Sequence, residues 1–185
     1  MKIAITGATG YIGSVLTPLL LAAGHELRIH SRPKKNRQDA AGITYVYGML
    51  LDPACIEKLV QDADAVIHLA AVISVSDTPD KDFFFFNTET TRLLAAAAQR
   101  AGVKKFIHIS SITAFEQAPY EERMDETRGP TRNMRYGYDH SKAVSQDIAL
   151  SFNGHGMEVM VLCPTAVTGP YDARPSLIGD AVARI

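Results

Sequence analysis

The sequence predicts an α/β fold built on a doubly wound parallel sheet of about six strands. Short apolar runs alternate with amphipathic helical patterns along the 185 residues, which is the order expected of βαβ units. The runs are nearly continuously apolar, as is typical of strands that helices cover on both faces. A glycine-rich turn joins the first run to the first helix. Such a sheet places its ligands outside the carboxyl ends of its strands.

Strands alternate with helices along most of the chain in the elements that we expect. The strands are expected at residues 2–5, 26–30, 44–47, 65–69, 105–109 and 158–162. The helices are expected at residues 11–23, 53–61, around 87–101, and 138–152. Residues 118–135 are rich in charge, Pro and Gly, which indicates a loop over the cleft rather than a linker between domains.

The composition fits one well-buried domain over residues 1–185. Of these residues 46% are hydrophobic and the formal net charge is -1, so electrostatics indicate neither nucleic acid nor an anionic membrane as a partner. Cys55 and Cys163 lie far apart, outside any metal-ligand spacing, and no metal site is expected. Nothing in the sequence resembles a secretory leader or a membrane-spanning apolar run, so we expect a cytoplasmic location.

The glycine-rich turn at residues 6–13 follows the first strand and opens the first helix. Glycines at three-residue intervals allow a sharp turn, a close approach to a pyrophosphate, and tight packing of the helix on the strand. The backbone N–H groups at the start of the helix then face the anion. A plain glycine turn is the alternative, but the flanking strand and helix favour a dinucleotide site. Its predicted residues are Gly7, Thr9, Gly10, Tyr11, Ile12 and Gly13.

Tyr138 and Lys142 are four residues apart at the start of a predicted helix, so both side chains lie on one helix face. Because a nearby ammonium favours the phenolate, we expect Lys142 to lower the pKa of Tyr138 from its ordinary value of about 10. Taken alone, this spacing is equally typical of a solvated helix face. Ser110 and Ser111 end the fifth strand, where a hydroxyl either holds a substrate carbonyl or merely caps the next turn.

With these motifs in chain order, the sequence resembles the extended short-chain dehydrogenase/reductase family, of the NAD(P)-dependent epimerase/dehydratase type. The resemblance extends from Met1 to the last residue and implies a Rossmann-type fold. Further marks of the family are His68, Leu69, Ala70 and Ala71 after the fourth strand, Asn87 in the next helix, and Pro164, Gly169 and Pro170 after the sixth strand.

The resemblance implies roles for individual residues. It makes Tyr138 the general acid/base, Lys142 the group that tunes it and holds the nicotinamide ribose, and Asn87 the support of a proton path. Of the two serines, Ser111 matches the family's catalytic hydroxyl. From the residues alone, Asn87 could equally cap or kink its helix, and His68 could be an ordinary buried histidine. Further cofactor contacts are expected from Leu50, Leu69, Ala70, Ala71, Pro164 and Val167.

The end of the second strand bears on the choice of cofactor. An NAD site usually has a carboxylate there for the adenine-ribose hydroxyls, whereas a 2′-phosphate requires a guanidinium. This strand ends in Ser31 and Arg32 without an acid, which favours NADP over NAD, with Lys34, Lys35 or Arg37 as further cations. A solvated basic loop is the alternative.

The predicted adenine contact departs from the family pattern. Relatives carry an Asp after the third strand that contacts the adenine amino group, and this chain has Met49 there. Met49 cannot accept that hydrogen bond, so adenine is expected to rest on Met49 and Leu50 by apolar contact, unless Asp52 substitutes.

The favoured function is a NADP-dependent oxidoreductase that interconverts a carbonyl and a secondary alcohol on a small-molecule substrate. Ile112 and Thr113 stand where sugar 4,6-dehydratases carry an Asp-Glu pair, so elimination chemistry is not expected. Residues 169–176 look like the dihydroflavonol-reductase-like branch, an analogy that names no substrate. An NAD-dependent nucleotide-sugar epimerase is the alternative. A non-catalytic redox sensor that binds a dinucleotide is the second alternative.

Two features bear on substrate and assembly. The four phenylalanines at 83–86 either wall an apolar substrate pocket or serve helix packing or a subunit interface. Relatives continue well past Ile185 with a domain that closes over substrate, so we expect residues 1–185 to be a Rossmann domain that is truncated or followed by a missing substrate domain. Relatives commonly dimerise through two long helices, which makes a homodimer an expected assembly.

Overall fold

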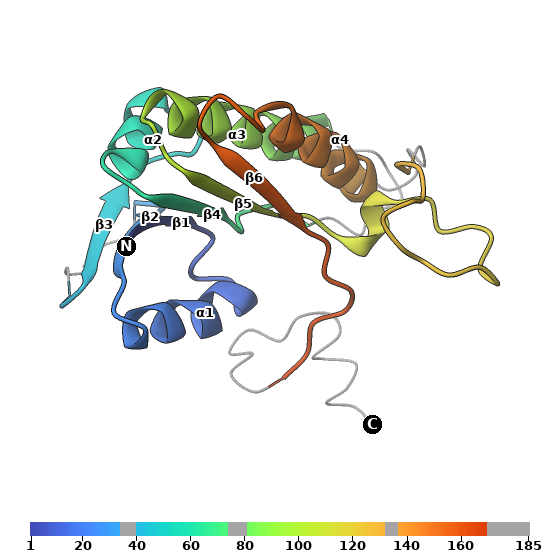
Figure 1. The fold of residues 1–185 in the computed structure, drawn as a ribbon, viewed down its shortest axis with the longest axis horizontal. Helices are drawn as coiled ribbons and strands as arrows, with labels where there is room; N and C mark the ends of the chain where they lie inside the picture. Colours follow the sequence, from blue (N-terminus) through green and yellow to red (C-terminus); the bar gives the residue numbers. More distant parts are fainter. Residues whose placement is uncertain (34–39, 74–80, 132–136, 170–185) are drawn as a thin grey trace.

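Six parallel strands form one sheet in the order β3-β2-β1-β4-β5-β6 (Figure 1). The fold comes from a computed structural model, which describes residues 1–33, 40–73, 81–131 and 137–169. The chain winds outward from β1 in one direction and from β4 in the other, so the predicted doubly wound sheet is confirmed. The strands are β1 (Lys2–Thr6), β2 (Glu26–Ser31), β3 (Ile43–Tyr47), β4 (Ala65–His68), β5 (Lys105–Ile109) and β6 (Glu158–Leu162).

Helices cover the two faces of the sheet unequally. α1 (Tyr11–Ala22) lies on one face, whereas α2 (Pro53–Val60), α3 (Lys81–Arg100) and α4 (Gly137–Ser151) lie together on the other (Figure 1). A short 3-10 turn, η1 (Ile112–Ala114), follows β5. Within the described part of the chain, no helix combines the length and apolar character needed to cross a membrane.

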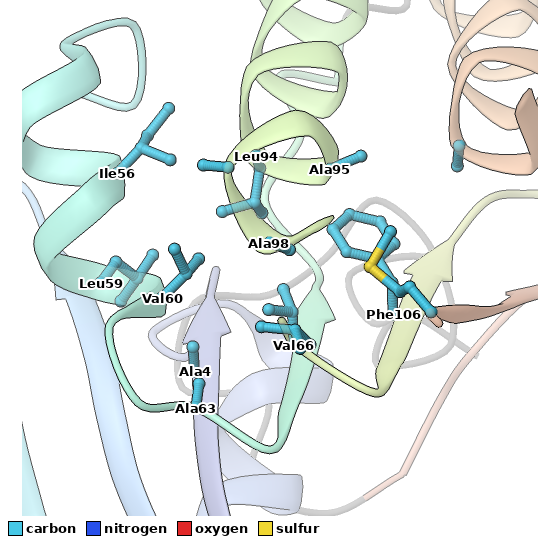
Figure 2. Close-up of a cluster of buried hydrophobic side chains, with 14 of the residues drawn as sticks. Ala4, Ile56, Leu59, Val60, Ala63, Val66, Leu94, Ala95, Ala98 and Phe106 are labelled. Carbon is cyan, nitrogen blue, oxygen red and sulfur yellow. The ribbon is translucent and has the colours of Figure 1, made fainter. Parts of the chain in front are cut away.

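The main apolar core lies between the sheet and helices α2, α3 and α4 (Figure 2). Val66 of β4 and Phe106 of β5 point up from the strands, and Leu59 of α2 and Leu94 of α3 meet them; all four side chains are fully buried. Burying one large apolar side chain contributes about 1.5–3 kcal/mol, so this contact surface holds the three helices on the sheet.

A second apolar cluster lies on the face that α1 covers. Ile5 of β1 and Ile29 of β2 are buried there, with Leu16 and Leu20 of α1 packed against them. Because successive strand residues point to opposite faces, β1 also buries Ala4 in the main core. Cover on both faces explains why the central strands β1 and β4 are buried at nearly every position.

Helix α3 begins earlier than the sequence predicts, at Lys81 rather than around Asn87. The four phenylalanines at 83–86 hid this start because apolar residues at four consecutive positions have no helical period. In the structure they face different ways: Phe86 packs against the main core, Phe84 stacks on His140 of α4 with ring centroids 5.1 Å apart, and Phe85 is 57% exposed. At least two of the four therefore serve packing.

Candidate active site

The carboxyl ends of β1, β4, β5 and β6 lie at one edge of the sheet, since all their pairings are parallel. The register places Thr6 beside His68, and His68 beside His108. The glycine turn, the segment after β4, the two serines after β5 and the segment after β6 therefore leave the sheet at neighbouring points. This edge is where a doubly wound sheet binds its ligands.

Two glycines of the turn are required by close backbone contacts. Gly7 has φ +75°, and a Cβ added there would lie 2.6 Å from the backbone nitrogen of Ala70. A Cβ on Gly13 would lie 2.4 Å from the carbonyl oxygen of Gly7. The first contact holds the turn against the segment after β4, and the second packs α1 onto the turn. No other residue fits either position without moving the backbone.

The start of α1 suits an anion. Gly10 is the N-cap, no side chain caps it, and the first turn of the helix holds no acidic residue. Thr9 and Gly10 are exposed, whereas Tyr11 and Ile12 are half-buried. Since the first N–H groups of a helix have no partner within the helix, this exposed end can donate hydrogen bonds to a diphosphate. The residues present therefore fit a dinucleotide.

Ser111, Tyr138 and Lys142 come together at this edge, near the end of β5. Tyr138 and Lys142 lie on α4, and the Lys142 Nζ atom is 6.0 Å from the centre of the Tyr138 ring. A hydrogen bond joins the side chains of Ser111 and Tyr138. Ser111 also caps η1, because its Oγ accepts a hydrogen bond from the backbone nitrogen of Thr113 at 3.2 Å. The two interpretations of this serine, substrate-facing and turn-capping, are thus compatible.

Lys142 is buried, with 4% of its surface exposed. Its Nζ donates a hydrogen bond to the carbonyl oxygen of Ile109 at 2.6 Å, which ties α4 to the end of β5. Burial lowers the pKa of Lys142 to about 8. The amine therefore titrates close to neutral pH.

The expected direction of the Tyr138 pKa is wrong. Burial raises this pKa, the carboxylate of Asp139 raises it further, and the hydrogen bond to Ser111 opposes them. The Lys142 Nζ donates to the Ile109 carbonyl and lies 6.0 Å from the ring centre, so its charge does not reverse the effect of burial on this pKa. At neutral pH the phenol keeps its proton, so Tyr138 is suited to donate one.

Asn87 clamps the segment after β4 to both long helices. Its side chain accepts a hydrogen bond from Val72 N at 2.8 Å and donates to Val72 O at 3.0 Å. It also donates to Ser141 Oγ of α4 at 2.9 Å. The Asn87 carbonyl oxygen accepts from Ser145 at 3.1 Å and from Thr91 at 2.9 Å. The structure thus gives Asn87 a positioning role that the sequence did not reveal.

A hydrogen-bonded row runs across the sheet through His68. Ala70 N donates to Thr6 Oγ1 at 3.2 Å, and Thr6 Oγ1 lies 2.7 Å from His68 Nδ1. On the other side, His68 Nε2 lies 3.1 Å from Thr91 Oγ1, which donates to the Asn87 carbonyl. Because Thr91 already donates, it must accept from His68, which assigns the proton to Nε2 and leaves Nδ1 to accept from Thr6. Both ring nitrogens are satisfied only while the imidazole is neutral.

The end of β2 carries the residues expected to choose the cofactor. Ser31 is buried and Arg32 is exposed, so the Arg32 guanidinium is accessible to a ligand. Lys34, Lys35 and Arg37 lie outside the described residues.

Of the residues expected near adenine, Met49 is 53% exposed, whereas Leu50 is 3% exposed and its side chain belongs to the main core. Asp52 is engaged as the N-cap of α2, where its carboxylate accepts from Ala54 N at 3.0 Å. Met49 therefore offers the open apolar surface here, and only the backbone of Leu50 remains for a ligand.

The remaining predicted cofactor residues also lie at the carboxyl edge. Leu69, Ala70 and Ala71 are half-buried in the segment after β4 that packs on the glycine turn. Pro164 follows β6 and accepts a hydrogen bond from Ile112 N at 3.0 Å, and Val167 is 38% exposed. Of residues 169–176 only Gly169 is described, and a Cβ on it would meet the Tyr11 hydroxyl at 2.9 Å. The segment after β6 thus reaches the start of α1.

Arg128 organises the loop between η1 and α4. Its guanidinium donates to five backbone carbonyls, those of Glu116, Gln117, Pro119, Glu122 and Arg123. The loop is also joined to the end of η1, because Thr131 N donates to Ala114 O at 2.8 Å. The predicted loop is present as far as residue 131, and residues 132–135 lie outside the described residues.

A cavity of about 450 Å³ lies at the opposite edge of the sheet, where Lys2, Glu26 and Ile43 line it. Arg28 also lines this cavity, but its guanidinium already donates to the carbonyl oxygens of Lys58 and Gln61. Tyr138, Lys142 and the glycine turn are at the other end of the strands, so this cavity does not belong to the candidate site.

The chain has relatives among well-described proteins. Sterol demethylase protein B of Methylococcus capsulatus is 31% identical over 184 residues, which cover 98% of this chain and 56% of that protein. A putative dihydroflavonol 4-reductase of Synechocystis is 26% identical over 183 residues, covering 97% and 53%. A 3-beta-hydroxysteroid dehydrogenase of Mycolicibacterium neoaurum is 28% identical over 178 residues, covering 92% and 48%. The chain spans about half the length of these relatives.

Solved structures show the same fold. UDP-glucose 4-epimerase of Thermus thermophilus, in complex with NAD, superposes with a TM-score of 0.81 at 26% identity, over 99% of this chain and 61% of that chain. A dTDP-glucose 4,6-dehydratase double mutant of Streptomyces venezuelae gives a TM-score of 0.85 at 23% identity, over 100% and 62%, which shows the fold alone. A family model matches residues 3–185. The chain therefore belongs to the NAD dependent epimerase/dehydratase family, as its resemblance to the extended short-chain dehydrogenases predicts.

Proposed function

We propose that this protein is a NADP-dependent oxidoreductase that interconverts a carbonyl and a secondary alcohol on a small-molecule substrate. The observation that carries the proposal is the half-buried phenol of Tyr138, which interacts with Ser111 and keeps its proton at neutral pH. It lies at the same edge of the sheet as the glycine turn. A protonated phenol in that place is a proton donor for an oxygen on which negative charge develops.

The residues divide the work of a carbonyl reduction. The Ser111 hydroxyl and the Tyr138 phenol both donate hydrogen bonds to the carbonyl oxygen, which orients the substrate and polarises its C=O bond. A bound NADPH would supply the hydride to the carbonyl carbon. Tyr138 then gives its proton to the oxygen, so that the products are the alcohol and the tyrosinate, which is reprotonated from solvent. Lys142, fixed by Ile109, places a positive charge beside the phenolate that forms.

The preference for NADP rests on the end of β2. Ser31 and Arg32 provide a hydroxyl and an exposed guanidinium, and no carboxylate stands there to repel a 2′-phosphate. Arg32 is the residue we assign to that phosphate.

A NAD-dependent nucleotide-sugar epimerase is the second candidate. The NAD complex of the Thermus thermophilus UDP-glucose 4-epimerase, which covers 99% of this chain, supports it. Epimerisation returns the hydride to the same molecule, so it consumes no cofactor, whereas net reduction does. Cofactor consumption therefore separates the two candidates.

The first test compares Tyr138→Phe with Tyr120→Phe, a control at a position that is 84% exposed. We expect NADPH consumption with a panel of ketones to fall about 10²–10⁴-fold in Tyr138→Phe, because the proton donor is lost. Steroid ketones and dihydroflavonols belong in the panel because relatives are named for them. Equal turnover by Tyr138→Phe and the unaltered protein would remove Tyr138 from the mechanism.

The second test is a titration with NADPH and NADH, followed by cofactor fluorescence. Arg32→Ala should weaken NADPH binding about tenfold or more and leave NADH binding nearly unchanged, since the guanidinium contacts only the 2′-phosphate. The control is Arg100→Ala, at an exposed position that is the last residue of α3. Tighter NADH binding that is insensitive to Arg32→Ala would support the epimerase, and binding without any turnover would support the redox sensor.

A further inference from the structure

The space between the carboxyl half of the sheet and helices α3 and α4 is filled by polar side chains. His68 and His108 lie on β4 and β5, with ring centroids 5.4 Å apart, and both are buried. Above them Thr91 of α3 and Lys142 of α4 are also buried. Buried polar groups are normally hydrogen-bonded, and His68 satisfies this rule through its two threonine partners.

His108 departs from that rule. Its side chain is 1% exposed, yet neither Nδ1 nor Nε2 has a hydrogen-bond partner among the described residues. Ser110, two residues further along the same strand face, is 3% exposed, and its Oγ has no nitrogen or oxygen partner there, although it interacts with the thiol of Cys163. An unsatisfied buried polar group costs about 1–3 kcal/mol, so a partner that is not a protein group would stabilise this part of the fold.

Lys142 meets β5 between these two residues. Its Nζ donates to the carbonyl of Ile109, the residue that separates His108 from Ser110. An ammonium has three N–H donors, and this bond uses one. The titratable groups near it are His68 on β4, His108 on β5, Cys163 after β6 and Tyr138 on α4. Burial keeps both imidazoles neutral, and the positive charge of Lys142 adds to that effect.

We propose that His108 and Ser110 hold an internal water molecule that accepts a hydrogen bond from the Lys142 ammonium and so positions it beside Tyr138. The water would donate one hydrogen to an imidazole nitrogen of His108 and the other to Ser110 Oγ. Three polar partners are the usual number for a buried water. A metal cation does not fit this place, because the Lys142 charge repels it.

The proposal makes His108 a positioning residue and rests on the proposed role of Lys142. The Asn87 carbonyl does not need this water as a partner, because it already accepts hydroxyl hydrogens from Ser145 and Thr91. The water on the β5 side would favour the charged amine, since an acceptor stabilises an ammonium more than a neutral amine.

The test follows the titration of Lys142 by NMR of ¹³C-labelled lysine, with the signal assigned by Lys142→Arg. Its pKa, which burial lowers to about 8, should fall by about one further unit in His108→Leu, because the bridging acceptor is lost. His108→Gln keeps polar atoms in place and should restore most of the original value. Phe106→Leu, on the same strand face but within the apolar core, is the matched control and should leave the titration unchanged.

An unchanged Lys142 pKa in folded His108→Leu would overturn the proposal. If that variant does not fold, the unaltered protein decides the matter through nuclear Overhauser contacts between water and the His108 ring. Long-lived contacts support the water, and their absence contradicts it. Neither readout depends on turnover, so an inactive protein would refute the proposed function and leave this test intact.

Discussion

The two halves of the layer between the sheet and helices α3 and α4 differ in chemistry, although the same strands build both. At the amino half, Val66 of β4 and Phe106 of β5 are paired in register and belong to the apolar core. Two residues further along each strand, the paired residues are His68 and His108. One step along the pleat thus changes a dry core into a buried polar cluster.

This difference separates stability from function. Apolar burial in the amino half stabilises the fold. In the carboxyl half, the burial of an amine and two imidazoles away from water lowers that stability. Lys142 and the Asn87 clamp both lie in the polar half. The buried polar groups therefore fix the positions of the side chains in the candidate site, but they also make the folded protein less stable in acid.

The largest expected effect is on the apolar half. Phe106→Ala should lower the free energy of unfolding by about 3–5 kcal/mol, since it removes a fully buried ring and leaves a cavity. Urea denaturation followed by circular dichroism measures this. The Lys142 titration should stay as it is, and a loss below about 1 kcal/mol would mean that Phe106 is not central to the core.

A second effect concerns acid stability and belongs to the polar half. The His68 pKa is lowered from 6.5 to about 3 by burial, so the unfolded chain binds a proton that the folded chain rejects. Stability is therefore full above about pH 6.5 and falls as the pH drops toward 3, by up to about 1.4 kcal/mol per pH unit for this group. His108, whose pKa is also well below its ordinary value, adds to the slope.

Unfolding free energies measured between about pH 5 and 7 check this, because few carboxylates titrate there. His68→Gln should remove about one proton from the pH dependence, even if the variant is less stable at every pH. His155→Asn, at an exposed position, is the control and should keep the slope. An identical slope in His68→Gln would show that the buried imidazole is protonated in the folded protein.

The smallest expected effect tests the row through His68. Thr91→Val keeps the shape of the side chain but removes the oxygen that lies 3.1 Å from His68 Nε2, at a cost of about 1–3 kcal/mol. Thr88→Val, one helical turn from Phe84, loses only a hydrogen bond to backbone carbonyls of its own helix and should cost less. Equal losses, measured by urea denaturation, would mean that the His68 contact contributes nothing of its own.

Much of the fold could be predicted from the sequence because parallel strands that are covered on both faces read as unbroken apolar runs. The bounds of β5 and β6 agree with the predicted ranges, and β6 was recognised from its apolar run although none of its residues is buried in the structure. The start of α3 could not be predicted, because a helix start is read from a change of period, and four successive phenylalanines conceal it. The early start matters, since it brings Phe84 onto His140 beside the site.

The candidate site could be predicted only in part from the sequence. The spacing of Tyr138 and Lys142 places both on one face of α4, but spacing carries no information about burial, which decides the direction of the Tyr138 pKa. The His108 environment was missed as well. Its position two residues after Phe106 and two before Ser110 puts all three on one strand face, and this period would have indicated a buried polar pair.

The Asn87 clamp has a consequence for how the protein would respond to a ligand. The amide grips Val72 through two hydrogen bonds and Ser141 through a third, so the segment after β4 cannot shift without pulling on α4. A ligand that displaces Ala70 or Ala71 would therefore also displace Ser141, which lies one helical turn from Tyr138 on α4. Ligand binding at the glycine turn and the orientation of Tyr138 would then be coupled through the Asn87 side chain.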